Sequence, residues 1–222
     1  TGITTTAATA AEIDTQVSTI KTDYSANGGS TSSLTTGAVS IVGTDKNDTI
    51  NAVVDGDTAD RDTFTVLDTI DGKAGTDTLK VVFNNDGGAA TTNSFPTATV
   101  SNVEVFDIKN LDSTTGTALT IDFGTISGET TVSNNNSLDD VIFNNLGDGT
   151  IAQVIGNGGS ANTVASTFDY ADAATSATVE LKDGIDNGAL SITGGKLTSV
   201  TIKSSGAKND IDALTLAAST TS

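Results

Sequence analysis

From residue 38 onward, the apolar residues fall in short runs in which they alternate with polar ones. The runs include VSIVG, DTFTVLDTI, DTLKVVF, VEVFDI, ALTIDF, TTVS, DVIF and AQVIG, and they are separated by Gly, Asn, Asp and Ser. An apolar residue at every second position places the apolar side chains on one face of a strand. The pattern therefore predicts a mainly β protein built of many short strands.

The second half of the chain repeats this pattern at a countable interval. Its apolar pairs are Val179/Leu181, Leu190/Ile192, Val200/Ile202 and Leu214/Leu216. The pairs follow one another at spacings of 11, 10 and 14 residues. Such spacings suit either hairpins with tight turns or the rungs of a coiled β-solenoid, where each strand stacks on the strand one coil earlier.

Two observations bear on the choice between these architectures. Asn-Gly dipeptides at 157 and 187 favour hairpins, which makes an antiparallel β-sandwich the alternative fold. The chain has few aromatic residues and no Trp, so its core consists mainly of Val, Ile, Leu, Ala and Thr. Thin stacked layers fit such a core better than a thick sandwich does. We therefore predict a β-solenoid or β-roll-like stack of strands.

The start of the chain has a different period. Its apolar residues recur at helical spacing, and they are Ile13, Val17, Ile20 and Tyr24. Threonines at 4–6 can cap the start of a helix, and Asn27-Gly28-Gly29 can end it. The pattern predicts one helix over about residues 8–25.

These periods divide the chain into three parts. We predict an N-terminal helix and linker (1–30), a β segment with acidic glycine turns (31–110) and a repetitive β segment (111–222). One helix alone buries only a narrow apolar face. We expect it to pack on the β part or to be the end of a helical anchoring domain outside this sequence.

Charge and composition narrow the possible functions. Ten Lys and Arg residues stand against 28 acidic residues, 24 of them Asp, and the net charge is −18. Such self-repulsion opposes compaction unless cations neutralise it, and it disfavours binding to nucleic acid or to an anionic membrane. No run is apolar for long enough to span a membrane. The chain has no Cys and no His, so it can form no disulfides and lacks the usual zinc ligands and the commonest general base. Hard cations bound by oxygen ligands are the remaining means of crosslinking the fold.

Two stretches have the residue types that such a cation requires. In DTIDGKAGTDTLKVVF (68–83), the core follows the nonapeptide G-G-x-G-x-D-x-U-x, with Lys73 in place of the second glycine. A glycine turn can direct backbone carbonyls inward, and Asp77 adds a carboxylate, as Ca²⁺ requires. GTDKNDTINAVV (43–54) repeats the arrangement, with Asp48 at the position of Asp77. These turns predict Ca²⁺ sites that fix the register of the strands that follow them.

A polysaccharide lyase or glycosidase on a β-solenoid is a remote alternative. Asp139 and Asp140 could serve as acid and base, but adjacent residues of a strand point to opposite faces. Arg61, the only arginine, lies in the acidic loop DGDTADRDTF (55–64), which lacks the glutamate that would close an EF-hand. We therefore predict that the chain is not an enzyme.

Three stretches in order carry a resemblance to a known family: LTTGAVSIVGTDKNDTINA (34–52), DTIDGKAGTDTLKVVF (68–83) and VSNVEVFDIKN (100–110). They are similar to calcium-binding surface-layer (S-layer) proteins and related repeats-in-toxin (RTX) surface proteins of Gram-negative bacteria. Such proteins show a threonine-rich lead, a G-T-x-x-N-D turn, a D-x-I-x-G-G-x-G-x-D-x-L turn and an I-x-N-[IV]-E-x-[IVF]-x-[IV] strand. The close match covers about a third of the chain.

The resemblance implies a set of Ca²⁺ ligands in the two turns. The implied ligands are the carbonyls of Gly43, Gly72 and Ala74 and the side chains of Asp45, Asp48 and Asp77. The full candidate set also includes Asn47, Asp68 and Asp71. Lys46 and Lys73 stand where the family has glycine. Glu104, between Val103 and Val105, is interpreted first as part of a solvated strand face and second as a further ligand.

The resemblance also implies a function and a place in the cell. It implies export by a type I machine, calcium-dependent folding outside the cell and lateral self-assembly into a lattice on the cell surface. The expected partners are other copies of the chain and, through an N-terminal region beyond this sequence, lipopolysaccharide. A calcium-dependent adhesin or biofilm matrix protein of similar build is the alternative.

Overall fold

The computed structural model describes residues 12–18, 28–56, 61–84, 95–112, 118–156 and 164–217, apart from the side chain of Asn187. Residues 12–18 are helical, which confirms a helix inside the predicted range; the rest of that range lies outside the described residues. Ile13 and Val17 of this helix are both exposed. Within the described ranges, no helix is long and apolar enough to cross a membrane.

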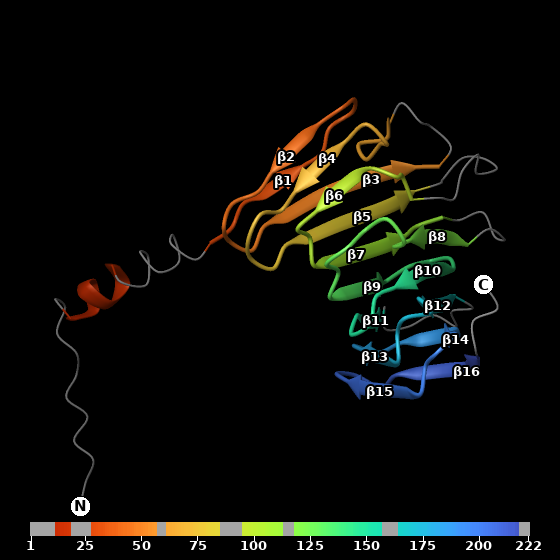
Figure 1. Ribbon diagram of the computed structural model, residues 1–222. Helices are drawn as coiled ribbons and strands as arrows, with labels where there is room; N and C mark the ends of the chain where they lie inside the picture. The colour runs from red at the N-terminus through yellow and green to blue at the C-terminus, as the bar shows by residue number, and fades with distance from the viewer. Residues whose placement is uncertain are drawn as a thin grey trace, which may run out of the picture.

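The remainder of the described chain is a stack of parallel strands (Figure 1). The strands are β1 (Thr31–Ser33), β2 (Ser40–Val42), β3 (Thr49–Asp55), β4 (Thr69–Asp71), β5 (Thr78–Asn84), β6 (Thr99–Ser101), β7 (Val105–Asn110), β8 (Leu119–Asp122), β9 (Thr131–Asn135), β10 (Val141–Leu146), β11 (Ile151–Ile155), β12 (Ala165–Tyr170), β13 (Ser176–Lys182), β14 (Asp186–Gly194), β15 (Ser199–Ser205) and β16 (Asp210–Ala217). Neighbouring strands in each sheet are parallel and lie two places apart along the chain, except that β6 does not pair with β8. The predicted β-solenoid-like architecture is thereby confirmed.

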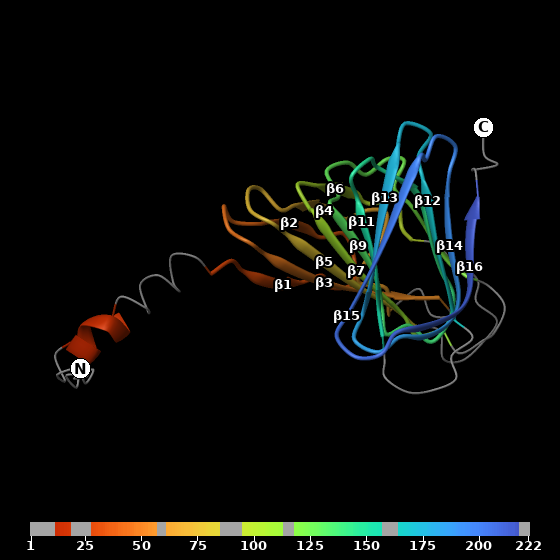
Figure 2. The same ribbon diagram turned by 90° about the horizontal axis from the view of Figure 1, so that it is seen from below.

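The strands form two walls that face each other (Figure 2). One wall is an eight-stranded sheet of the odd-numbered strands from β1 to β15. The other wall consists of a three-stranded sheet, β2-β4-β6, and a five-stranded sheet from β8 to β16. The eight-stranded sheet continues across residue 110, because β7 pairs with β9. The predicted division of the β part at residue 110 stays a prediction.

The register of the strands explains the repeat seen in the sequence. Val179 lies beside Ile202, and Leu190 lies beside Leu214. A complete coil therefore contains two strands, and a spacing of 10 to 14 residues corresponds to half a coil. The antiparallel alternative is wrong: Asn187 and Gly188 lie inside β14 and not in a hairpin turn, while the dipeptide at 157 lies outside the described residues.

The core fills the space between the two walls. Alternate residues of most strands are buried, as in β7, β12 and β13. The few aromatic residues gather at its centre, where Phe143 stacks on Phe168 at a ring-centroid distance of 5.3 Å and Phe106 meets Phe123 edge to face at 5.0 Å. Aromatic contacts of this kind add to the stabilisation from burial alone. The middle coils are therefore held by larger side chains than the sequence analysis assumed.

Candidate cation site at the stacked turns

The two predicted turns lie one above the other in consecutive coils. Residues 43–48 connect β2 to β3, and residues 72–77 connect β4 to β5. The backbone N–H of Gly43 donates to the carbonyl of Asp71 at 2.7 Å, and the N–H of Thr76 donates to Oδ1 of Asn47 at 2.9 Å. The motif residues of the two coils are therefore held in register by direct hydrogen bonds.

Glycine is required at the head of each turn because oxygen atoms occupy the space of a side chain. A Cβ on Gly72 would lie 1.9 Å from the carbonyl oxygen of Asn102 and 2.5 Å from Oδ2 of Asp77. A Cβ on Gly43 would lie 2.4 Å from the carbonyl oxygen of Gly72 and 2.6 Å from Oδ2 of Asp48. At both turns a carbonyl oxygen of the next coil and a carboxylate oxygen thus crowd the space beside a glycine.

The acidic side chains at this corner form a column along the stack. Asp48 accepts a hydrogen bond from the backbone N–H of Ser30. Asp77 Oδ1 accepts from the N–H of Asp48 at 2.6 Å, and Glu104 Oε2 accepts from the N–H of Asp77 at 2.8 Å. Each carboxylate therefore binds the backbone of the preceding coil. Glu104 belongs to this column, although the sequence analysis interpreted it first as a residue of a solvated strand face.

Asp48 has partners for both of its carboxylate oxygens. Oδ2 accepts from the backbone N–H of Thr44 at 2.6 Å, and the Thr44 hydroxyl lies 3.1 Å away. Burial by itself would raise the pKa of Asp48, but the hydrogen bonds from Thr44 and Ser30 outweigh it and hold the pKa below its ordinary value. Asp48 is thus a buried carboxylate that the fold stabilises in its ionised form.

Asp77 has the opposite environment. Its side chain is fully buried, and Oδ2 has no hydrogen-bond partner. Burial raises the pKa of Asp77, and the negative charges of Asp48, Glu104 and Asp71 raise it further, against the effect of the hydrogen bond from Asp48. A buried carboxylate oxygen without a partner is costly, so this atom marks where a proton or a cation would be most stabilising.

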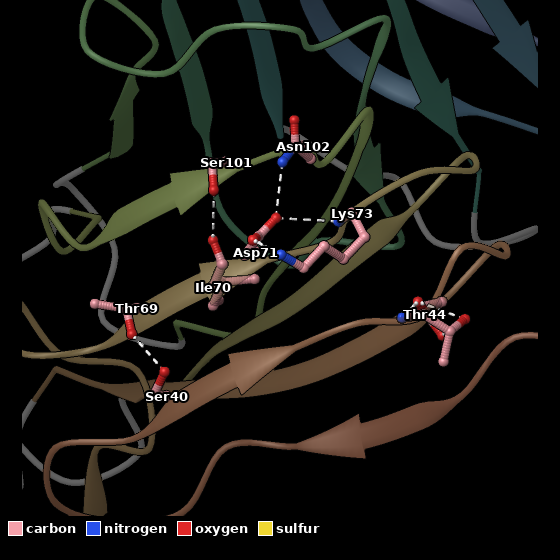
Figure 3. Close-up of polar contacts among 9 residues, drawn as sticks. Ser40, Thr44, Thr69, Ile70, Asp71, Lys73, Ser101 and Asn102 are labelled. Carbon is pink, nitrogen blue, oxygen red and sulfur yellow. Dashed lines mark hydrogen bonds and ion pairs between the residues drawn. The ribbon is translucent and has the colours of Figure 1, made fainter.

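Lys73 occupies the position of the second glycine of the nonapeptide and adopts the backbone conformation expected of that glycine. Its φ of 76° lies in the left-handed region, which is the conformation that favours glycine there. Its ammonium group lies 2.7 Å from Oδ2 of Asp71, whose Oδ1 also accepts from Nδ2 of Asn102 at 2.7 Å (Figure 3). Lys73 therefore keeps the turn geometry and neutralises Asp71 at the rim of the site.

The other candidate ligands are not all at this corner. Asp68 precedes β4, at the opposite end of that strand from Asp71, and caps the backbone N–H groups of Val39 at 2.8 Å and Thr65 at 2.6 Å. Asp45 and Ala74 are exposed. The structure thus groups Gly43, Asp48, Gly72 and Asp77 and separates Asp68 from them.

The oxygen atoms at this corner are of the chemical type that binds a hard cation. They are carboxylate and backbone carbonyl oxygens, which Ca²⁺ prefers, and one of the carboxylate oxygens is unpartnered. No group of three or more acidic side chains in the described ranges is arranged to hold a metal ion. Backbone oxygens would therefore supply most of the ligands, with Asp77 as the central carboxylate.

A second buried polar cluster lies where β7 ends and β10 begins. Asn110 donates through Nδ2 to the carbonyl of Asp140 at 3.0 Å, and Asp140 Oδ1 accepts from the N–H of Ala165 at 2.6 Å. Asp139 Oδ2 is buried without a partner, and burial, followed by the charges of Asp140 and Asp112, raises the pKa of Asp139. Asp139 and Asp140 precede β10, so the expectation that they alternate along a strand is wrong.

Arg61 faces the acidic residues of its own loop. Its guanidinium lies 3.7 Å from Oδ2 of Asp55, and Oδ1 of Asp62 accepts from the backbone N–H of Asp55 at 2.6 Å. The middle of that loop, residues 57–60, lies outside the described residues. Asp62, in the connection between β3 and β4, thus binds the last residue of β3.

Comparison of the chain with protein-family models, curated proteins and solved structures gives no match. The chemistry of the stacked turns is therefore the basis for assigning a function.

Proposed function

We propose that this chain is a calcium-stiffened structural segment of a secreted bacterial surface-layer protein. The observation that carries the proposal is the unpartnered Oδ2 of Asp77, which is buried beside the carbonyl oxygen of Asn102. Both oxygens lie within 2.5 Å of the place that a Cβ on Gly72 would take, so a cation bound in this small space would be stabilised by both of them. The resemblance of the same turn to RTX repeats makes Ca²⁺ the cation of choice.

The position of Asp77 gives such an ion a mechanical role. Its other oxygen already binds the N–H of Asp48 in the preceding coil, and Asn102 belongs to the following coil. An ion held by Asp77 and by backbone oxygens of this corner would add a bond between consecutive coils. It would also offset part of the net charge of −18, since each Ca²⁺ carries two positive charges.

Thermal unfolding tests the metal requirement. In a few millimolar CaCl₂ the melting temperature should rise well above its value in EDTA, because an ion that binds only the folded state stabilises it by mass action. Magnesium should do much less, because it keeps its water shell and demands a tighter octahedral geometry. Circular dichroism during heating would measure all three conditions.

Asp77→Asn is the variant that assigns the response to this site. Asn keeps Oδ1 for the N–H of Asp48, and it places an amide N–H₂ beside Asn102, so the variant should melt in EDTA at or above the wild-type temperature. Its melting temperature should no longer rise with calcium. Asp183→Asn is the matched control, because Asp183 lies in an exposed left-handed turn position that Asn also tolerates.

Two results would contradict the proposal. Equal melting temperatures of the wild-type chain in EDTA and in calcium would remove the metal requirement. An unchanged calcium response in Asp77→Asn would show that the ion binds elsewhere. Light scattering of the folded chain with and without calcium would test the lateral assembly separately.

A further inference from the structure

The two stacked turns hold their buried carboxylates in equivalent places. Oδ2 of Asp48 lies 2.6 Å from the place that a Cβ on Gly43 would take, and Oδ2 of Asp77 lies 2.5 Å from the corresponding place beside Gly72. Each carboxylate also accepts, through Oδ1, a hydrogen bond from the backbone of the preceding coil. The position of the carboxylate and one of its partners are therefore common to both turns, and they do not explain why Asp48 is satisfied and Asp77 is not.

The difference between the turns lies in one backbone N–H. In the first turn the N–H of Thr44 donates to Oδ2 of Asp48 at 2.6 Å. In the second turn the N–H at the same position belongs to Lys73, and it donates to Oδ1 of Asp71 at 3.1 Å. Asp77 therefore lacks the donor that completes the hydrogen bonding of Asp48.

Asp71 has further contacts that hold it in this position. Its Oδ1 also accepts from Nδ2 of Asn102 at 2.7 Å, and its Oδ2 lies 2.7 Å from the ammonium group of Lys73 (Figure 3). An aspartate that accepts the N–H two residues later stabilises a local turn. Lys73 has a φ of 76° in this turn, which costs free energy for a residue with a Cβ, and the contacts with Asp71 offset that cost.

The first turn shows the arrangement without such a carboxylate. Val42 lies beside Asp71 in the parallel register of β2 and β4, and its side chain can accept no hydrogen bond. Val42 is 63% exposed, so this position accommodates an apolar or a charged side chain. The N–H of Thr44 has no competing carboxylate two residues earlier, and it binds Asp48. The chain thus contains both versions of the turn.

We infer that Asp71 is a positioning residue that keeps the second turn open for a cation. By accepting the N–H of Lys73, it leaves Oδ2 of Asp77 free to bind the ion, without being a ligand itself. A turn without this carboxylate uses its own N–H to satisfy the buried aspartate. The residue before the turn glycine therefore decides whether the turn binds a cation or closes on itself.

This role of Asp71 rests on the proposed function for the identity of the ion. The exchange of hydrogen-bond partners does not depend on calcium, so it is measured in EDTA as well. If calcium fails to raise the melting temperature of the wild-type chain, the proposed function fails, and the comparison in EDTA still tests Asp71.

Two substitutions at position 71 separate positioning from charge. Asp71→Val reproduces the residue of the first turn and removes the acceptor, so the N–H of Lys73 should turn to Oδ2 of Asp77. The rise in melting temperature with a few millimolar CaCl₂ should then fall to that of Asp77→Asn. Asp71→Asn removes the same charge but keeps Oδ1 as an acceptor, so it should retain most of the rise.

Asp210→Val is the matched control. Asp210 is also paired with a lysine two residues away, since the ammonium group of Lys208 lies 2.8 Å from its Oδ2, but it lies in β16, far along the stack. The control should leave the calcium response unchanged. Circular dichroism at low temperature checks that each variant folds, and Asp71→Ala, which removes the same acceptor, is the second variant.

A comparison in EDTA tests the hydrogen bond without any metal. In the wild-type background Asp77→Asn should melt at or above the wild-type temperature. In the Asp71→Val background the same substitution should lower the melting temperature, because the new amide N–H₂ then faces the N–H of Lys73 or of Asp48. The sign of the effect therefore reports which carboxylate accepts the N–H of Lys73.

Three results would overturn the inference. A full calcium response in Asp71→Val would show that Asp77 stays open without Asp71. Equal losses in Asp71→Val and Asp71→Asn would make the charge of Asp71, or its direct coordination of the ion, the decisive property. An effect of Asp77→Asn with the same sign in both backgrounds would show that the N–H of Lys73 does not change partner.

Discussion

At the scale of single residues, Asp48 and Asp77 show how one motif position acquires two electrostatic roles. Both follow a glycine turn and both are buried. Asp48 receives hydrogen bonds at both oxygens, which lowers its pKa, while Asp77 keeps one oxygen without a partner, and burial with its acidic neighbours raises its pKa. The difference arises mainly within the turns, because the backbone N–H of Thr44 donates to Oδ2 of Asp48, whereas the N–H of Lys73, at the same position of the next turn, donates to Asp71. The preceding coil adds the negative charge of Asp48 beside Asp77.

These opposite shifts predict opposite pH dependences in metal-free buffer. Because the folded pKa of Asp77 is raised, its contribution to stability is lost as the pH rises through that pKa, so Asp77→Asn should gain stability over the wild type as the pH rises above the ordinary aspartate pKa of about 3.9. The folded pKa of Asp48 is lowered, so its contribution is present above the ordinary aspartate pKa of about 3.9 and is lost on acidification.

The measurement is urea unfolding of both variants and the wild type at several pH values. Asp48→Asn should be less stable than the wild type near neutral pH, by about 1–3 kcal/mol, because an amide N–H₂ then faces the N–H of Thr44 or of Ser30. That deficit should shrink as the pH falls. Parallel pH profiles for the two variants would contradict the assignment of their environments.

At the scale of elements, the aromatic centre of the core is formed by Phe143 in β10, Phe168 in β12 and Phe123 directly after β8. Phe143 contacts Phe168 at 5.3 Å and Phe123 at 6.3 Å between ring centroids, and all three are buried. Phe143→Ala should lower the free energy of unfolding by about 3–5 kcal/mol, because it leaves a cavity between rings of three consecutive coils. Leu138→Ala, at an exposed position before β10, should change it little; equal losses would show that the aromatic stack is not the stabilising centre.

The sequence shows where strands lie more clearly than which strands pair. Alternation in VEVFDI and ATVELK is a local property, so β7 and β13 could be placed from it. Pairing depends on contacts between residues 20 to 30 positions apart, such as Val179 with Ile202, and no local pattern contains that information. The Asn-Gly signal at 187 misled for the same reason, since β12 and β16 on either side hold Gly188 inside a strand.

At the candidate site, too, local sequence patterns predict the residues of each turn but not the contacts between coils. The glycines and aspartates of the turns could be predicted because their spacing is local, and Gly43, Asp48, Gly72 and Asp77 do meet at one corner. Asp68 is as close to Gly72 in sequence as Asp77 is, but the short strand β4 separates it from that corner. Glu104 could not be assigned to the column, because its role depends on the N–H of Asp77 one coil earlier.

At the scale of the whole molecule, net charge and stacking oppose each other. A charge of −18 repels itself along the entire solenoid, while each coil contacts mainly its two neighbours. Specific hydrogen bonds such as those of the acidic column act only between adjacent coils. Screening by salt acts on the whole charge distribution. A salt series therefore separates the effect of net charge on stability from the effect of the hydrogen bonds between adjacent coils.

We therefore predict that the melting temperature in EDTA rises when NaCl is raised from low concentration to about 0.5 M, where the Debye length is only a few ångströms. Calcium should add a further rise in high salt, because an ion bound by buried oxygens is screened much less than surface charge. Differential scanning calorimetry over a salt series with EDTA, calcium or magnesium would measure both effects. If high salt abolished the calcium effect, calcium would act only as a diffuse counterion, and the buried oxygen of Asp77 would not be its ligand.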